Sequence, residues 1–203
     1  IIAEQDSSKI YLLKDNNIRW EKTLEGNISR ISVNSSGYST IILKGTAYKS
    51  VVLLLDDSGN EMFKYYMSST IAVDASISED NEYVGIAEVN TSGTLIQSNI
   101  KILSIAKAKE NPTEAIVYTY NAPLNSLVLN IKYQNKNKLV CEYDNEIHVI
   151  KDNVDTKLTD INTDQEKITY YSIELDNNIV KNVEENASLF TTNTAIKIIN
   201  STT

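Results

Sequence analysis

The chain has 203 residues, an apolar fraction of 41% and a formal net charge of −8. An acidic chain with only two arginines, Arg19 and Arg30, lacks the clustered positive charge on which nucleic-acid binding depends, and anionic lipid headgroups repel it. The single cysteine, Cys141, excludes an intramolecular disulfide, and the longest apolar run, Val51 to Leu55, is far shorter than the ~20 residues that span a bilayer. We predict a protein without a nucleic-acid partner and without membrane insertion by this segment.

The chain begins at Ile1 rather than at a methionine, and neither the charged nor the apolar region of a signal peptide follows. We therefore expect these residues to be a piece of a longer chain, from which any anchor or signal has been removed. Two prolines and six glycines are too few for a long linker, so the sequence shows no internal domain boundary.

Strand-like runs alternate with tight polar turns along the first third of the chain. The turn residues are mostly Asn, Asp, Ser and Gly, of which Asn, Asp and Gly tolerate the positive φ of a tight hairpin. The paired runs are Lys9–Lys14 with Ile18–Leu24, Ile28–Val33 with Tyr38–Leu43, and Ser50–Leu55 with Asn60–Met67. Each pair predicts a β-hairpin.

The stretch from Ile71 to Val89 shows the same pattern most clearly. Its first run alternates apolar and polar residues, which predicts a half-buried strand with two distinct faces (Ile71, Val73, Ala75 and Ile77 against Asp74, Ser76 and Ser78). Its second run, Tyr83 to Val89, is apolar nearly throughout and predicts a more deeply buried strand. The chain is therefore organised as one hairpin after another.

The residues that precede successive turns measure a repeat. Val33 and Ile77 are 44 residues apart, Tyr133 follows 56 residues later, and Ile173 follows after 40 more. Units of this length with four strands each are typical of β-propeller blades. The longer unit contains an insertion, Ile105–Glu114, between its third and fourth strands; it predicts the chain's one helical turn, ended by Asn111-Pro112.

Two kinds of hairpin carry a family resemblance. I-S-V-N-S-S-G-Y-S-T-I-I-L and A-S-I-S-E-D-N-E-Y-V-G-I-A resemble the S-x-D-G-x-Y-L-A hairpin of WD40-like and TolB-like propellers. L-L-L-D-D-S-G-N-E-M-F and Y-L-L-K-D-N-N-I-R-W resemble the third-to-fourth-strand hairpin of quinoprotein-like propellers, in which an aromatic residue, here Phe63 or Trp20, closes the outer strand. The Trp-Asp and Gly-His signatures of true WD40 repeats are absent, so the resemblance implies architecture only.

The predicted fold is all-β: a propeller or propeller fragment of about four to five four-stranded antiparallel blades, in one repeat domain over residues 1–203. The start supplies the last three strands of one blade, three full blades follow, and Ile168–Asn200 supplies about three strands of another. The two ends do not obviously complete one blade, which favours an open crescent or part of a larger ring and exposes terminal blades to self-association. A β-sandwich is the alternative that strand patterns also allow.

No residue pattern predicts catalysis, a metal or a cofactor. His148 and Cys141 are the only residues of their types, too few for a standard zinc site, and we interpret them as an ordinary strand residue and a buried small hydrophobe. The acidic turns at Asp56–Asn60 and Glu79–Asn81 lack the calcium-binding EF-hand pattern, which favours solvated turns. We predict a protein that is not an enzyme.

The sequence therefore predicts a binding or scaffold domain whose rim loops contact an unknown protein or cell-wall glycan. The candidate contact residues lie in the inserted segment: Lys107, Lys109, Glu110 and Asn111. Paired tyrosines such as Tyr65 and Tyr66 favour cross-strand packing, with an interface or sugar-stacking role as the alternative. The chain also resembles uncharacterised bacterial propeller-like proteins held outside the cytoplasmic membrane by one N-terminal anchor, which implies an extracytoplasmic location.

Two alternatives remain open. The first is a carbohydrate-active or hydrolytic enzyme, which would need two rim carboxylates ~5 to 9.5 Å apart across a cleft. The second is a structural spacer within a larger envelope protein.

Overall fold

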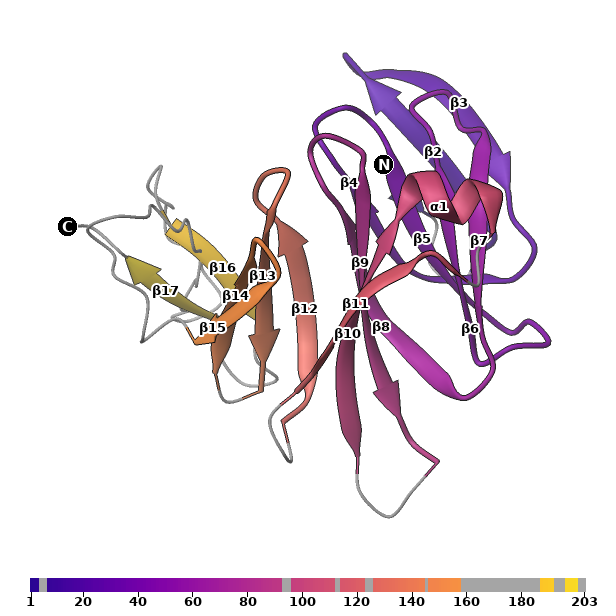
Figure 1. Ribbon diagram of the computed structural model, residues 1–203. Coiled ribbons are helices and arrows are strands. Elements are labelled where there is room, and N and C mark those ends of the chain that lie inside the picture. Colours follow the sequence, from indigo (N-terminus) through magenta and orange to yellow (C-terminus); the bar gives the residue numbers. More distant parts are fainter. Residues whose placement is uncertain are drawn as a thin grey trace. The chain divides into compact units, whose positions relative to one another are not determined.

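The computed structural model describes residues 1–3, 7–92, 96–111, 114–122, 126–144, 146–157, 187–191 and 196–200 (Figure 1). The strands are β1 (Ile2–Ala3), β2 (Lys9–Lys14), β3 (Asn17–Thr23), β4 (Asn27–Val33), β5 (Ser39–Lys44), β6 (Ser50–Leu55), β7 (Glu61–Met67), β8 (Thr70–Ile77), β9 (Tyr83–Asn90), β10 (Gln97–Ser104), β11 (Ile116–Asn121), β12 (Val128–Tyr133), β13 (Lys138–Tyr143), β14 (Ile147–Lys151), β15 (Val154–Lys157), β16 (Ala187–Thr191) and β17 (Ile196–Asn200), and the helix is α1 (Ile105–Glu110).

Consecutive strands pair into separate antiparallel sheets. Three sheets have four strands each, in chain order: β4 to β7, β8 to β11 and β12 to β15. A three-stranded sheet, β1-β2-β3, precedes them, and β16 pairs with β17 near the end of the chain. We call the first four sheets blades 1 to 4. The predicted three starting strands followed by three full blades are confirmed, and the chain is an all-β propeller fragment.

Three hydrophobic cores join neighbouring blades. One core lies between blades 1 and 2, another between blades 2 and 3, and a third between blades 3 and 4. Strand β6 is buried along its whole length because Val51, Leu53 and Leu55 enter the first core while Val52 and Leu54 enter the second. A strand buried on both faces explains an uninterrupted apolar run that shows no alternation.

The predicted alternation is confirmed from Asp74 to Ile77 and is wrong at Val73, which lies on the face opposite to Ala75 and Ile77. A register shift between Ala72 and Asp74 adds one residue to β8, and beyond such a β-bulge the side chains exchange faces. Ala72, Ala75 and Ile77 pack towards blade 2, whereas Val73 packs towards blade 4. The predicted polar face is also buried, because a second blade covers it.

The same bulge recurs in the first strand of each complete blade. The register shifts lie between Ile28 and Arg30 in β4, between Ala72 and Asp74 in β8, and between Val128 and Asn130 in β12. Arg30, Asp74 and Asn130 are therefore equivalent positions, spaced by the 44 and 56 residues that the turns predict. The repeat deduced from the sequence is the structural repeat.

The aromatic residues of the quinoprotein-like hairpins occupy corresponding places in two blades. Trp20 on β3 packs against the core between blades 1 and 2, and its Nε1 donates to the Asp57 carbonyl at 3.2 Å. Phe63 on β7 is buried in the core between blades 2 and 3. Each ring closes its own outer strand against the next blade, as the resemblance implies.

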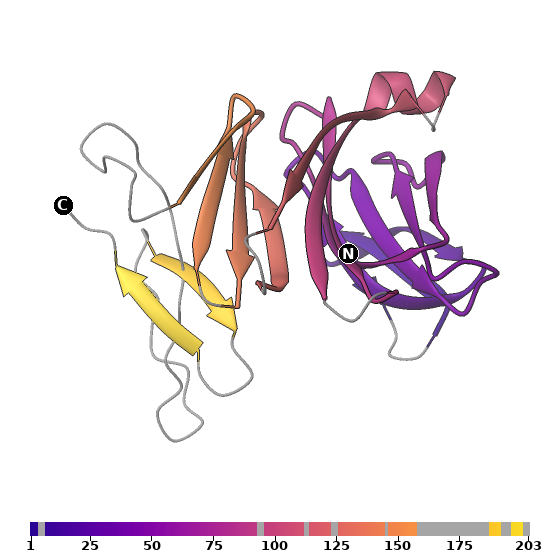
Figure 2. The same ribbon diagram turned by 60° about the horizontal axis from the view of Figure 1, so that its bottom comes forward.

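The inserted helix α1 connects the third and fourth strands of blade 3, as predicted, and lies at one end of them (Figure 2). Ser104 caps its start by accepting from the Lys107 N–H, and the Asn111 N–H donates to the Lys107 carbonyl at its end. Ile105 and Ala108 are buried in the core between blades 2 and 3. The opposite side of the helix is exposed to solvent.

The chain divides into two compact units, residues 1–155 and 156–203. Of the predicted last blade, the structure describes β16 and β17 as an antiparallel pair, and residues 158–186 lie outside the described residues. The prediction of one domain over 1–203 stays a prediction. In the described part of the chain no helix is both long and apolar enough to cross a membrane.

Candidate functional site

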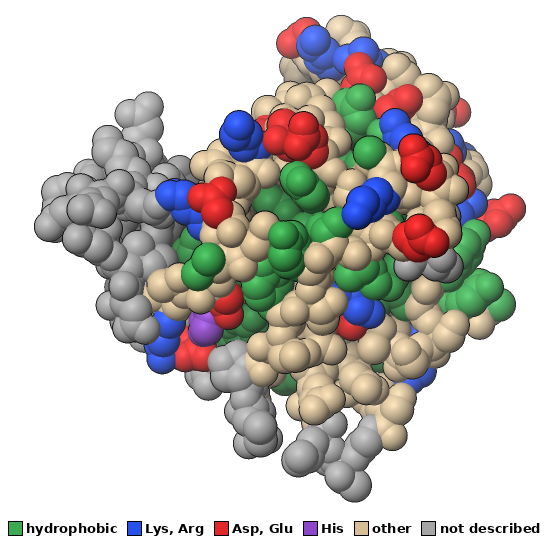
Figure 3. All heavy atoms as spheres, viewed as in Figure 1, with side chains coloured by type: hydrophobic (Ala, Val, Ile, Leu, Met, Phe, Trp, Pro, Cys, Tyr) green, Lys and Arg blue, Asp and Glu red, His purple; other side chains and the backbone are tan. Residues whose placement is uncertain are grey.

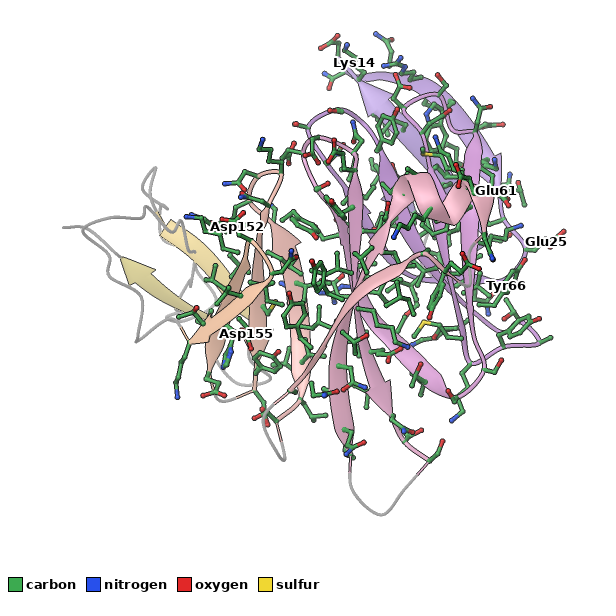
Figure 4. The ribbon with its side chains drawn as sticks, viewed as in Figure 1. Lys14, Glu25, Glu61, Tyr66, Asp152 and Asp155 are labelled. Atoms are coloured by element: carbon green, nitrogen blue, oxygen red, sulfur yellow. The ribbon has the colours of Figure 1, made fainter. Side chains whose placement is uncertain are left out.

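A cavity of about 400 Å³ opens beside blade 2. Two connections wall it in: the link from β3 to β4, with Glu25 and Gly26, and the loop from β5 to β6, from Gly45 to Tyr48. The ends of β6 and β7 complete it, and in Figure 4 the side chains of Glu25 and Tyr66 lie at the same end of this blade. Its volume is within the ~300–1,000 Å³ usual for ligand pockets.

Two tyrosines from separate segments meet at this cavity. The rings of Tyr48, in the loop, and Tyr66, on β7, have centroids 4.7 Å apart and are tilted by 43°. Both are exposed, at 40% and 52% of their surface. Neither hydroxyl makes a hydrogen bond within the described residues. Aromatic surface left open in this way is more typical of recognition than of packing.

Two hydrogen bonds restrain the backbone of the loop that carries Tyr48. The Tyr48 N–H donates to Thr46 Oγ1, and Thr46 Oγ1 donates to the Tyr48 carbonyl, both at 3.1 Å. Gly26, with φ +119°, lies so close that a Cβ there would be 2.9 Å from the Lys44 carbonyl oxygen. Only glycine fits this approach of the two connections, so the wall of the cavity depends on it.

One residue of each charge lines the cavity. Lys64 forms an ion pair with Glu61 at 3.0 Å, and this hydrogen bond, with further contributions from Tyr66 and Glu25, raises the pKa of Lys64. No described residue donates a hydrogen bond to the Glu25 carboxylate. The cavity therefore offers an ammonium already paired with Glu61, a carboxylate acceptor and two aromatic hydroxyls.

The four predicted contact residues lie on α1 and at its C-cap. Lys107, Lys109 and Glu110 are exposed. The Asn111 side chain instead donates to Glu114 Oε1 at 3.0 Å and so belongs to the helix end. Whether these residues contact a partner stays a prediction.

The predicted contact residues and the cavity lie at opposite ends of the blades. The Ile105 N–H at the start of α1 donates to Glu82 in the β8–β9 turn, and Asn34 links that turn to the β4–β5 turn through the Ser78 carbonyl. The cavity lies at the far end of β5, where Lys49 reaches Ser69 in the β7–β8 link. The two surfaces are separate.

A polar cluster joins the bulge positions of three blades. Arg30 Nε donates to Asp74 Oδ1 at 3.1 Å, and an Arg30 amino group lies 3.4 Å from Asn130 Oδ1. Asp74 Oδ2 accepts from the Ile131 N–H at 2.9 Å. Burial raises the pKa of Asp74 and outweighs the opposing effect of Arg30. Nearby Glu142 is 5% exposed, and burial raises its pKa to about 7.

His148 lies between two carboxylates. Its Nδ1 is 2.9 Å from Asp155 Oδ1 and its Nε2 is 3.1 Å from Glu146 Oε1, the second contact not being aligned as a hydrogen bond. Tyr143 meets the ring edge-on at 5.0 Å. In Figure 3 the imidazole reaches the surface beside acidic side chains. Sequence reasoning missed this arrangement because Asp155 approaches only across the β14–β15 hairpin.

Cys141 and the acidic turns serve local structure. Cys141 is fully buried, and burial raises the pKa of its thiol well above the ordinary value, which disfavours the nucleophilic thiolate. Asp56 accepts from the backbone N–H groups of Ser58 and Asn60; these bonds lower its pKa although burial acts to raise it. The described residues contain no group of three His, Cys, Asp or Glu placed to hold a metal.

Neither of two cavities provides a pair of catalytic carboxylates. The cavity beside blade 2 is lined by one, Glu25. A smaller cavity of about 160 Å³ is lined by Asp152 as its one carboxylate, with Tyr83 and Tyr133. These cavities give no support to the two-carboxylate hydrolase alternative. Across the face shown in Figure 3, positive and negative side chains are interspersed.

Four-stranded antiparallel blades with consecutive strand order define a WD40-like propeller fold, here a fragment of one. The chain belongs to a family of unknown function (DUF5711), whose sequence model matches residues 1–202. A search of curated proteins gave no match.

Solved structures are similar to this chain at low sequence identity. "KlHsv2 with loop 6CD replaced by a Gly-Ser linker" is 10% identical with a TM-score of 0.52, and the match covers 72% of this chain and 47% of that one. The C-terminal WD40 domain of Sif2 is 12% identical (TM-score 0.48, 72% and 40% covered), and Hsv2 of Kluyvelomyces marxianus is 13% identical (TM-score 0.46, 72% and 47% covered). The chain thus spans less than half the length of each.

Proposed function

We propose that the protein is a non-enzymatic binding module and that the cavity beside blade 2 is its recognition site. The observation that carries this proposal is the exposed pair Tyr48 and Tyr66 over a cavity of about 400 Å³. Rigid aromatic side chains supply large contact area at little entropic cost, which suits them to recognition. The proposal includes an extracytoplasmic location with a membrane anchor outside this sequence, in line with the resemblance described above.

Capture experiments with the 203-residue chain test the binding role. We expect saturable binding to material from the envelope fraction of the native cell, lost in Tyr48→Ala/Tyr66→Ala. Tyr118→Ala is the matched control, because Tyr118 is 41% exposed and also pairs with a second tyrosine, Tyr120, on blade 3. Equal capture by all three proteins, or no saturable capture at all, would contradict the proposal and favour a spacer.

The location needs its own test. Protease added to intact native cells should degrade the protein if it lies outside the cytoplasmic membrane, while a cytoplasmic marker stays whole. Protection equal to that of the marker would refute the extracytoplasmic part of the proposal without touching the binding role.

The terminal blades are the second candidate interaction surface. Among the described residues blade 1 has three strands, and we propose that a strand of another chain pairs with β1 at its edge. Light scattering over a concentration series should show a dimer or larger species if terminal blades self-associate. A monomer mass that stays constant over the concentration series would exclude self-association.

A further inference from the structure

We propose that the cavity beside blade 2 binds a neutral glycan, with one pyranose ring placed against Tyr48 and Tyr66 between Glu25 and Lys64. This inference rests on the proposed binding function and adds the chemical class of the ligand. Charge balance, hydrogen-bonding groups and aromatic geometry each support it.

The charge of the cavity favours a neutral ligand. Its lining includes one carboxylate, Glu25, and one ammonium, Lys64, which is already paired with Glu61 at 3.0 Å. A phosphate or carboxylate ligand would lie beside two acidic side chains, Glu25 and Glu61, and would be repelled. A neutral polar molecule meets no such cost, and its hydroxyls can use both Glu25 and Lys64.

The hydrogen-bonding groups match hydroxyls that both donate and accept. The Glu25 carboxylate can only accept, the Lys64 ammonium can only donate, and the hydroxyls of Tyr48 and Tyr66 do both. No described residue donates to the Glu25 carboxylate, and neither tyrosine hydroxyl has a hydrogen-bond partner there. A sugar ring offers neighbouring hydroxyls of both kinds in one small volume.

The aromatic pair supplies the apolar part of such a site. The two rings are tilted by 43° with centroids 4.7 Å apart, so they form a corner rather than a closed stack. One face of a pyranose ring consists of C–H groups, which pack on an aromatic face as other apolar surface does. Leu43, Val51 and Ala47 continue the apolar wall. The hydrogen bonds within the loop hold Tyr48 in place before a ligand arrives, which lowers the entropic cost of binding.

An extended peptide is the competing ligand class, and it fits less well. Peptides commonly bind by adding main-chain hydrogen bonds to a strand edge. Here the groups that line the cavity come from two connections and the ends of strands, and its polar groups are side chains. A ligand recognised by convergent side chains is better matched by a compact ring.

Calorimetric titration of the 203-residue chain tests the proposal. The neutral probes are maltotriose, cellotriose, mannotriose and N-acetylchitotriose. The charged probes are the glucosamine trimer, which is the cationic counterpart of N-acetylchitotriose, and 3′-sialyllactose, which is anionic. We expect at least one neutral trisaccharide to bind with a Kd on the order of 1 mM or below, as suits an open cavity, and the charged probes to bind at least about tenfold more weakly.

Variants locate the site. Tyr66→Ala should weaken binding of the neutral trisaccharide by about tenfold or more, whereas Tyr118→Ala should leave it unchanged. Glu25→Gln, which keeps the shape and a carbonyl acceptor, should weaken binding by roughly threefold, since Glu25 is exposed and the fold does not depend on it. An unchanged thermal midpoint confirms that each variant is folded.

Three results would overturn the glycan assignment: no neutral trisaccharide binding, binding that is unaffected by Tyr66→Ala, or tighter binding of a charged probe. Selection of heptapeptides from a phage-displayed random library that bind through Tyr66 in the absence of sugar binding would replace it with a peptide. If capture of envelope material depends on the tyrosine pair while no sugar binds, the binding function stands and the ligand class fails.

Discussion

The inner strands of blades 2 to 4 and the cavity beside blade 2 use polar residues in opposite ways. In the inner cluster, Arg30 joins Asp74 and Asn130, and Asp74 also accepts from the Ile131 N–H, so that hydrogen bonds link three blades. In the cavity, no described residue makes a hydrogen bond to the Glu25 carboxylate or to either tyrosine hydroxyl. Groups that are satisfied within the fold stabilise it, whereas groups left open cost little there and are available to a ligand. The repeat builds the scaffold, and the connections that differ between blades form the cavity that we propose as the recognition site.

The largest effect on stability is expected at Asp74. Asp74→Ala removes the partner of Arg30 and leaves the Ile131 N–H buried without an acceptor, which should lower the free energy of unfolding by about 2–4 kcal/mol. Urea-induced unfolding of the variant and the parent chain measures this difference in the free energy of unfolding. Asp74→Asn is the control: it keeps an acceptor oxygen, and because burial already disfavours the charged form, it should cost less. Equal loss in both variants would show that the charge, rather than the hydrogen bond, joins the blades.

Glu142 should make the stability of the inner cluster depend on pH. Burial raises its pKa to about 7 in the folded chain, against ~4.3 when unfolded, so the folded state binds more protons between these values. Its contribution to stability is therefore full below about pH 4.3, falls as the pH rises to 7 by at most ~1.4 kcal/mol per unit, and then levels off.

The variant Glu142→Gln isolates this contribution. Unfolding of both proteins in urea at pH 5 and pH 8 should show a smaller loss of stability in the variant than in the parent chain. Identical losses would mean that Glu142 does not titrate within this window.

At the cavity, a substitution should affect ligand binding more than it affects stability. Tyr66→Ala removes a ring that is 52% exposed, so it should lower the free energy of unfolding by less than about 1 kcal/mol while weakening ligand binding by about tenfold or more. Thermal denaturation and the binding assay, run on the same sample, measure both. A large loss of stability would place Tyr66 with the packing residues instead.

The smallest effect is expected at the helix. Lys107→Ala/Lys109→Ala changes two exposed side chains on α1 and should shift the free energy of unfolding by no more than about 0.5 kcal/mol. Binding at the cavity should be unchanged, because α1 lies at the other end of the blades. Loss of envelope capture in this variant, with the cavity intact, would instead establish the sequence-predicted residues as the contact surface.

Local chemistry made the hairpins, the blade count and the helix predictable. Turns rich in Asn, Asp and Gly located each hairpin, and the spacing of Val33 and Ile77 gave the repeat. The bulge at Asp74 was not predictable, because Ile71 to Ile77 reads as an ordinary alternating strand. Only the approach of a second blade shows why its polar side chains are buried.

The cavity could not be located from sequence because its parts lie far apart in the chain. Glu25, Tyr48 and Tyr66 belong to three segments, and each is an unremarkable residue within its own. For the pair Tyr65 and Tyr66 the sequence left an interface or sugar-stacking role open as the alternative, yet nothing near the pair pointed to Tyr48. The separation of Asp155 from His148 by a hairpin turn hid that cluster in the same way.

Arg30 also bears on how the blades lose structure. Blades that touch only their neighbours behave as a linear array, in which disorder can begin at either end and advance unit by unit. Arg30 reaches past blade 3 to Asn130, 100 residues away, and so links two units that are not adjacent. Because this bond is lost when either blade unfolds, it disfavours states in which one blade is unfolded and the others remain folded. It favours a single sharp transition over a stepwise one.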